Sequence, residues 1–194
     1  MDFKEIVLKN RSYRRFDQSS TITKEQLLQW VDLARQAASG SNLQGLKYYL
    51  VWEPEEAQKL FETVTFAAYL RDWAGPQPGE QPAAYIVILG DRFIKPNLDM
   101  DCGIAAQTIL LGATADGYGG LMMGSFKRDS LSKLLALPEN LDILLVLALG
   151  KPTEKVVLVP IDETHGVRYY RDENEVHYVP KRALEDIVFW KGSF

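Results

Sequence analysis

A long apolar stretch, from about residue 98 to residue 116, places the strongest constraint on how this chain folds. It is rich in Ala, Ile and Leu around much of its expected circumference, so a helix here has no broad polar face to turn toward water. Such a helix is buried, either in the core or against another subunit. Residues 83–90 form an almost unbroken apolar run of strand length, which predicts a strand covered on both faces.

The remaining pattern mixes helices and strands without the regular repetition of a doubly wound sheet. Thr23 and Gln26 have the spacing of a capping box before an apolar stripe, which predicts a helix ending at Gly40. Further helices are expected over residues 2–9, 53–64, 129–135 and 183–190, and strands over residues 46–52, 121–123 and 143–149. This mixture predicts an α+β fold, and 194 residues suit a single domain.

Composition excludes several classes of protein. The chain has 22 Lys and Arg against 26 Asp and Glu, a net charge of −4 that disfavours nucleic-acid binding through bulk charge. The first residues are charged where a signal peptide needs an apolar core, and no run reaches membrane-spanning length, so we expect a cytoplasmic protein with no membrane partner. Cys102 has no second cysteine to pair with, and with only His165 and His177 beside it no metal site is expected.

Arg11, Ser12 and Arg14 form the first cluster that could carry chemistry. Two guanidinium groups and a hydroxyl, just after a short helix, can bind a phosphate or the anionic edge of a ring. The alternative is a basic surface patch that simply faces water. Arg15 fits that alternative better, because in extended backbone it points away from Arg14.

Three more clusters follow along the chain. Ser39 to Asn42, with Gln44, can present hydroxyl and amide groups to a polar ligand, although an ordinary helix end and turn also explains them. Residues 119–124 can offer backbone N–H groups and methionine side chains to a planar ring, or can be a packed strand. Lys181 and Arg182 can bind an anion, or can be a solvated pair.

Other catalytic patterns are absent or better explained by structure. The sequence contains neither the Gly-x-x-x-x-Gly-Lys-Ser/Thr phosphate loop nor the Gly-x-Gly-x-x-Gly dinucleotide motif. Cys102 lies near the start of the most apolar helix without a nearby base, which favours a buried, inert thiol over a nucleophile. Asp99 and Asp101 are interpreted as carboxylates in the first turn of that helix.

Taken in order, the four clusters resemble the nitroreductase family of FMN-dependent oxidoreductases. Residues 101–107, at the start of the long helix, and residues 147–152, at the end of a strand, strengthen the resemblance, which covers essentially the whole chain. It implies a central, mostly antiparallel sheet flanked by helices in an intertwined homodimer. It also implies one FMN-binding domain over residues 1–194, with a C-terminal arm from about residue 156.

The resemblance also implies roles for individual residues. Arg11 and Ser12 would hold the FMN phosphate and ribityl chain. Arg14 would face the pyrimidine edge of the flavin, where reduction leaves negative charge. The other positions expected to contact the cofactor are Ser39 and Asn42 from the partner subunit, and Gly120, Leu121, Met122, Lys181 and Arg182.

The activity implied is a ping-pong reduction of nitroaromatics, quinones or related electron-poor acceptors by NADH or NADPH. The chemistry resides in the cofactor, so no protein acid or base is predicted. Residues 45–46 and 122–123 stand where relatives often have aromatic side chains. A non-catalytic dimer that binds or stores flavin is therefore the alternative, and a hydrolase dependent on Cys102 is a third.

Overall fold

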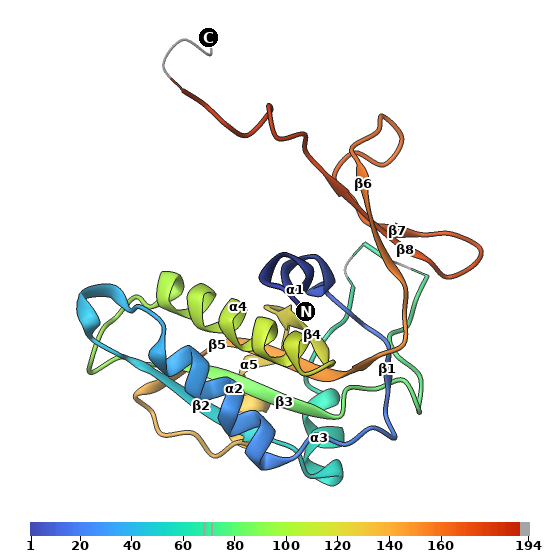
Figure 1. The fold of residues 1–194 in the computed structure, drawn as a ribbon. Helices are drawn as coiled ribbons and strands as arrows, with labels where there is room; N and C mark the ends of the chain where they lie inside the picture. Colours follow the sequence, from blue (N-terminus) through green and yellow to red (C-terminus); the bar gives the residue numbers. More distant parts are fainter. Residues whose placement is uncertain (68, 71, 191–194) are drawn as a thin grey trace. The chain divides into compact units, whose positions relative to one another are not determined.

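The computed structural model describes residues 1–67, 69–70 and 72–190, which divide into two compact units (Figure 1). Unit 1 comprises Met1–Phe66 and Ala74–Thr153, and unit 2 comprises Ala67–Trp73 and the chain from Glu154 onward. No helix in the described ranges is long and apolar enough to cross a membrane.

An antiparallel sheet forms the centre of unit 1. Its strands run in the order β1-β5-β3-β2, and β4 also pairs with β5. Every strand pair in it is antiparallel, as the sequence analysis predicted. The strands are β1 (Phe16–Asp17), β2 (Leu46–Val51), β3 (Ala84–Asp91), β4 (Gly119–Met123) and β5 (Leu141–Pro152).

Helices cover both faces of this sheet. One face packs against α2 (Lys24–Gln36) and α4 (Asp99–Ala115), and the other against α3 (Pro54–Phe61) and α5 (Arg128–Leu134) (Figure 1). Alternate side chains of β3 enter the two cores, as the period of two in a strand requires: Ile86 and Ile88 on the first face, Tyr85 and Val87 on the second. The predicted strand covered on both faces is confirmed.

The helix α2 ends earlier than the sequence pattern predicts. Its last residue is Gln36, the backbone of Ala37 is extended, and Gly40 begins the short 3-10 turn η1 (Gly40–Asn42). The prediction of a helix continuing to Gly40 is therefore wrong. The physical reason is tertiary: Asp101 of α4 accepts the Gly40 N–H at 2.8 Å and holds the chain in a turn.

The long apolar helix is buried on one side only. Ala105, Ala106 and Ile109 are buried against the sheet and α2. Met100 is 77% exposed and Ile104 37% exposed on the other side, near the N-terminal end of α4. The short helix α1 (Phe3–Lys9) contains no buried residue in this chain. Both helices therefore present apolar side chains that this chain leaves uncovered.

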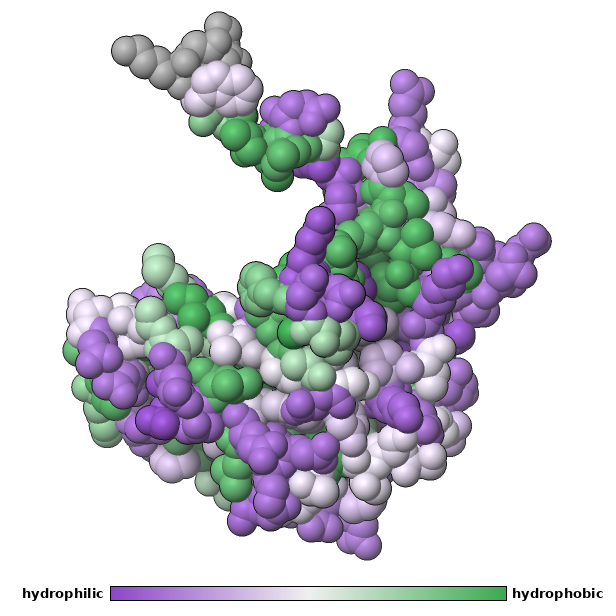
Figure 2. All heavy atoms as spheres, viewed as in Figure 1, coloured by the Kyte–Doolittle hydropathy of each residue, from purple (hydrophilic) through white to green (hydrophobic). Residues whose placement is uncertain are grey.

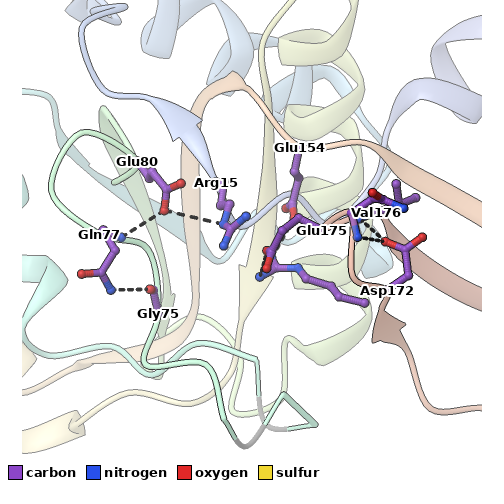
Figure 3. Close-up of polar contacts among 10 residues, drawn as sticks. Arg15, Gly75, Gln77, Glu80, Glu154, Asp172, Glu175 and Val176 are labelled. Atoms are coloured by element: carbon purple, nitrogen blue, oxygen red, sulfur yellow. Dashed lines mark hydrogen bonds and ion pairs between the residues drawn. The ribbon is translucent and has the colours of Figure 1, made fainter.

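Unit 2 contains a small sheet in which β6 (Val156–Pro160) pairs in parallel with β8 (His177–Lys181), and β7 (Tyr170–Arg171) pairs antiparallel with β8. The side chain of Arg171 pairs with Glu154 at 2.8 Å and stacks on Trp73. Through Arg171, these contacts join Trp73 to the part of unit 2 that begins at Glu154. Figure 3 shows the turn between β7 and β8, in which Asp172 accepts the Val176 N–H.

The predicted helix over residues 183–190 is wrong. These residues form turns and irregular backbone, and all of their side chains are exposed. Figure 2 shows the resulting apolar surface along the end of the described chain. A short helix depends on burial of its apolar face, and in the described structure the side chains of residues 183–190 stay exposed.

Candidate functional site

The N-terminal cluster lies along the edge of β4. Ser12 forms a parallel bridge with Gly120, and the Tyr13 N–H donates to the Gly120 carbonyl at 3.1 Å. The chain reaches this edge directly from α1, whose start is fixed by a capping box between Asp2 and Glu5. The structure therefore brings together six predicted cofactor residues from two distant segments: Arg11, Ser12, Arg14, Gly120, Leu121 and Met122.

The glycines of β4 are required by the packing of the protein itself. A Cβ at Gly120 would lie 2.3 Å from the Ala148 carbonyl oxygen, and one at Gly119 would lie 2.7 Å from the Tyr13 ring. Leu121 is buried, whereas Met122 is 39% exposed beside these glycines. The packed-strand interpretation thus explains the glycines, and Met122 is the side chain of β4 open to a ligand.

The two arginines of this cluster are held by backbone carbonyls. The Arg14 side chain is buried and donates from Nη1 to the Ser12 carbonyl at 3.1 Å. Arg11 donates from Nη2 to the Val7 carbonyl at 2.7 Å, while its buried Nε has no hydrogen-bond partner among the described residues. No carboxylate in the described part of the chain forms an ion pair with Arg11. A cation with an unused donor suits a phosphate, so these residues fit the phosphate end of FMN.

Arg15 was predicted to face water, but its side chain is only 20% exposed and forms an ion pair. Its Nε lies 3.6 Å from Glu80 Oε2, and Glu80 also accepts the Gln77 N–H (Figure 3). The side chain therefore fastens the loop before β3 to the N-terminal segment. It offers a matched control for Arg11 and Arg14.

The second cluster forms a tight, strained turn. Ser41, Asn42 and Gln44 all have positive φ, between 52° and 54°, which non-glycine residues rarely adopt. The Ser39 hydroxyl accepts the Gln44 N–H at 3.1 Å, and the Asn42 carbonyl accepts from the Gln44 side chain at 3.3 Å. Backbone strain of this kind persists only where the surrounding structure enforces it, and it concentrates at functional sites.

Asp101 enforces this turn. Its side chain is 2% exposed, accepts the Gly40 N–H, and has Oδ2 3.5 Å from Lys95 Nζ. The predicted position in the first turn of the long helix is confirmed. The sequence analysis missed its contact with Gly40, because nothing in the spacing of residues 61 positions apart indicates such a bond.

A cavity of about 140 Å³ lies beside the turn. Its polar lining includes Ser39, Gln44 and Asp101, and its apolar lining includes Ile104 and Tyr48. Burial raises the pKa of Tyr48 to about 12, so this phenol stays protonated at neutral pH. The cavity thus combines an apolar floor with small hydrogen-bonding groups.

Within one chain, the cluster that contains Arg14 and Gly120 lies far from the turn that contains Ser39 and Asn42. Leu46, which follows the turn, pairs with Gly90, and Gly90 pairs with Asp142 near the start of β5. Gly120 pairs with Leu149 near the other end of β5. At roughly 3.4 Å per residue, these positions lie about 24 Å apart along the strand. Ser39 and Asn42 therefore do not join Arg14 within one chain.

The last predicted cluster, Lys181 and Arg182, belongs to unit 2. Lys181 ends β8 and its carbonyl accepts the Ile161 N–H, while both cationic side chains are exposed. Their approach to the FMN phosphate stays a prediction.

Cys102 and the acidic residues offer no alternative centre. Cys102 is buried, and burial raises the pKa of its thiol to about 11, which removes the thiolate that a nucleophile needs at neutral pH. Among the residues that the structure describes, no group of three or more His, Cys, Asp or Glu side chains is arranged to hold a metal. The donor set along β4 is cationic and suits an anionic organic cofactor.

Comparison with known proteins gives the family. The model of the nitroreductase family matches residues 7–151, so this chain belongs to the nitroreductase family. That family comprises FMN-dependent NAD(P)H oxidoreductases, the class predicted from the sequence.

Relatives and solved structures agree with the assignment. A Vibrio harveyi NADPH-flavin oxidoreductase is 27% identical over 89% of this chain and 75% of its own length. A nitroreductase family protein from Clostridium difficile has the same fold, with a TM-score of 0.68 at 24% identity over 98% of this chain and 99% of that one. A protein from Exiguobacterium sibiricum, solved in complex with FMN, has a TM-score of 0.66 at 20% identity over 79% and 90% of the two chains.

Proposed function

We propose that this protein binds FMN and uses NADH or NADPH to reduce nitroaromatics, quinones or related electron-poor acceptors in a ping-pong cycle. The observation that carries the proposal is the alignment of Arg11, Ser12 and Arg14 along β4, beside the exposed Met122. When bound, FMN supplies hydride transfer between the two substrates.

The residues of the chain then have distinct tasks. Arg11 and Ser12 would bind the phosphate and ribityl chain, using the unused Nε donor and the exposed hydroxyl. Arg14, held by the Ser12 carbonyl, would stabilise the negative charge that reduction places at the pyrimidine edge. The backbone of Gly120 and Leu121 and the side chain of Met122 would lie against the ring system.

The complete site would require a second copy of the chain. Ser39 and Asn42 lie too far from Arg14 along the sheet to reach the same cofactor, so we assign them to the site of the partner in a homodimer. The uncovered apolar side chains of α1 and α4, Phe3 and Met100 among them, supply surface for such an interface. We further propose that unit 2 serves as the arm of one FMN-binding domain, that Lys181 and Arg182 close on the phosphate, and that the protein works in the cytoplasm.

The test begins with the purified protein and FMN. We expect yellow protein that retains FMN, and rapid loss of flavin absorbance when it is mixed anaerobically with NADH or NADPH in a stopped-flow instrument. A panel of nitroaromatics, quinones and enones then identifies the acceptor by reoxidation. Protein that takes up no FMN would refute the proposal, and bound FMN that neither nucleotide reduces would favour the flavin-storage alternative.

A matched pair of variants tests the placement of the phosphate. Arg11→Ala should weaken FMN binding about tenfold, the cost of one charge-assisted contact. Arg15→Ala removes the same charge from a side chain committed to Glu80, and should leave FMN affinity within about twofold of the parent. Equal losses in both variants would mean that bulk charge, rather than this site, binds the phosphate.

A further inference from the structure

Two neighbouring methionines in β4 have opposite surroundings. Met122 is 39% exposed, whereas Met123 is 3% exposed and packs in the core on the face of the sheet that α3 and α5 cover. Successive side chains of a strand point to opposite faces, which explains the contrast. The same thioether group therefore occurs once open to solvent and once enclosed, within a single strand.

The reaction open to the Met122 side chain is oxidation by hydrogen peroxide, which converts a thioether to a sulfoxide. The sulfur donates an electron pair to one peroxide oxygen, and the O–O bond breaks as the S–O bond forms. The second oxygen leaves as water with both protons. The sulfur loses two electrons and the peroxide gains two, so the step needs no further reactant. Contact between peroxide and sulfur is its only structural requirement.

The other sulfur atoms differ from that of Met122 in exposure or in place. Cys102 is buried, and burial raises the pKa of its thiol to about 11, so the thiolate that reacts with peroxide is scarce at neutral pH. Met1 is 56% exposed and Met100 77% exposed, so both are open to peroxide, but neither belongs to β4. Among the described residues, Met122 is the sulfur side chain of β4 that peroxide can reach.

The place of Met122 in β4 gives its oxidation a consequence. Met122 is two residues along the strand from Gly120, which forms the parallel bridge with Ser12. Alternate residues of a strand share a face, so the Met122 side chain lies on the same face as Gly120. In the proposed function this thioether lies against the planar flavin ring, a contact that sulfur favours. A sulfoxide replaces that apolar surface with a polar one.

We propose that Met122 is a peroxide-sensitive modification site, and that its conversion to the sulfoxide weakens the binding of FMN. The modification itself needs no cofactor, whereas its consequence rests on the proposed function. Peroxide thus lowers the flavin content of the protein, and enzymatic reduction of the sulfoxide restores it.

The first experiment measures the modification. The purified protein, once freed of FMN and once saturated with it, is exposed to dilute hydrogen peroxide. Peptide mass spectrometry, with fragmentation that resolves residues 122 and 123, follows the oxygen gained by each methionine. Without FMN, Met122 should be oxidised at least about tenfold faster than Met123. Saturating FMN should slow the oxidation of Met122 about tenfold, because the ring covers the thioether, and should leave Met1 unaffected.

The second experiment measures the consequence for FMN. After the peroxide has been removed with catalase, treated protein should bind FMN about tenfold more weakly in a fluorescence titration, the scale of one lost sulfur–aromatic contact. The melting temperature of the FMN-free protein should change by less than about 2 °C, since the altered side chain lies at the surface. Methionine sulfoxide reductase with its reductant should restore the affinity.

Matched variants assign the effect to one sulfur atom. Met122→Leu keeps an apolar side chain of similar size but cannot form a sulfoxide, so each variant is compared with itself before and after peroxide. Treatment should change the FMN affinity of Met122→Leu by less than about twofold, although Met1 and Met100 are still present. Met123→Leu retains Met122 and should lose affinity about tenfold, as the parent protein does.

Three results would overturn the proposal. Oxidation of Met122 no faster than that of Met123 would show that peroxide does not reach its thioether. Treated parent protein with full FMN affinity would remove the consequence, and an equal loss in parent and Met122→Leu would place the damage at another residue. Protein that never binds FMN would instead refute the proposed function, and the mass spectra of Met122 and Met123 would then decide the modification alone.

Discussion

The two clusters assigned to the flavin site are held in place by different means. The segment that contains Arg11 and Arg14 is fixed by backbone pairing to β4, and β4 is fixed by its pairing with β5. The turn from Ser39 to Gln44 has three residues in a strained conformation and depends on the buried carboxylate of Asp101. The first cluster is secured by the sheet as a whole, whereas the second depends on one side chain from a distant helix.

The largest effect is expected where the sheet itself is disturbed. In Gly120→Ala the new Cβ meets a backbone carbonyl that has no rotamer to change, so β4 must move. We expect a loss of about 3 kcal/mol in the free energy of unfolding, measured by urea denaturation, together with weaker FMN binding. Gly124→Ala is the control, because a Cβ there meets nothing within 4 Å. Equal stability of the two variants would contradict the close packing of β4.

The second-largest effect is expected when Asp101, which holds the turn from Ser39 to Gln44, is replaced. Asp101→Ala leaves the Gly40 N–H and Lys95 without their acceptor, and should cost about 2 kcal/mol of unfolding free energy. Because the turn is released, FMN affinity should fall by more than the loss of stability alone explains. Asp99→Ala changes an exposed carboxylate in the same helical turn and should do neither. If Asp99→Ala weakens FMN binding equally, the charge of the helix end matters rather than the anchor.

A smaller, kinetic effect is expected at Arg14. Arg14→Ala should retain part of its FMN but reduce it about tenfold more slowly, a barrier increase of about 1.4 kcal/mol, because the lost charge stabilises the reduced form more than the oxidised one. Stopped-flow reduction by NADH and NADPH measures this, with Arg15→Ala beside it. Unchanged reduction kinetics in Arg14→Ala would refute the placement of this residue at the pyrimidine edge.

The smallest effect is expected at Cys102, which follows Asp101 on α4 but faces the core. Cys102→Ala should keep its reductase activity within about twofold, since the thiol touches neither cluster. Burial holds the thiol protonated up to a pKa of about 11. Alkylation of the native protein should therefore be slow at neutral pH and accelerate as the pH rises toward that value. Fast labelling at neutral pH, or loss of activity in the variant, would revive the hydrolase hypothesis.

The sequence predicted the elements that depend on local pattern. The apolar run of β3 and the long apolar α4 both form where their hydrophobicity places them. The end of α2 and the irregular residues 183–190 escaped prediction. The first is decided by the hydrogen bond that the Gly40 N–H donates to Asp101, and the second by side chains that stay exposed in the described structure.

The candidate site likewise has features that the sequence predicted and features that depend on tertiary contacts. The residue types at positions 11–14 indicated anion binding, and the structure supplies the alignment with Gly120 that no sequence spacing reveals. The positive φ angles of Ser41 and Asn42, and the anchoring role of Asp101, left no signal in a single sequence. Local chemistry can be read from residue types, whereas register and strain arise only from tertiary contacts.

The central position of β5 has a consequence for the order of events during synthesis. β1, β3 and β4 all pair with this strand, and it ends at Pro152, late in the chain. A nascent chain that has emerged only as far as β4 can pair β3 with β2, but the other edge of β3 has no partner until β5 emerges. The sheet therefore cannot close until the chain has been synthesised through residue 152, long after its apolar strand β3 has emerged.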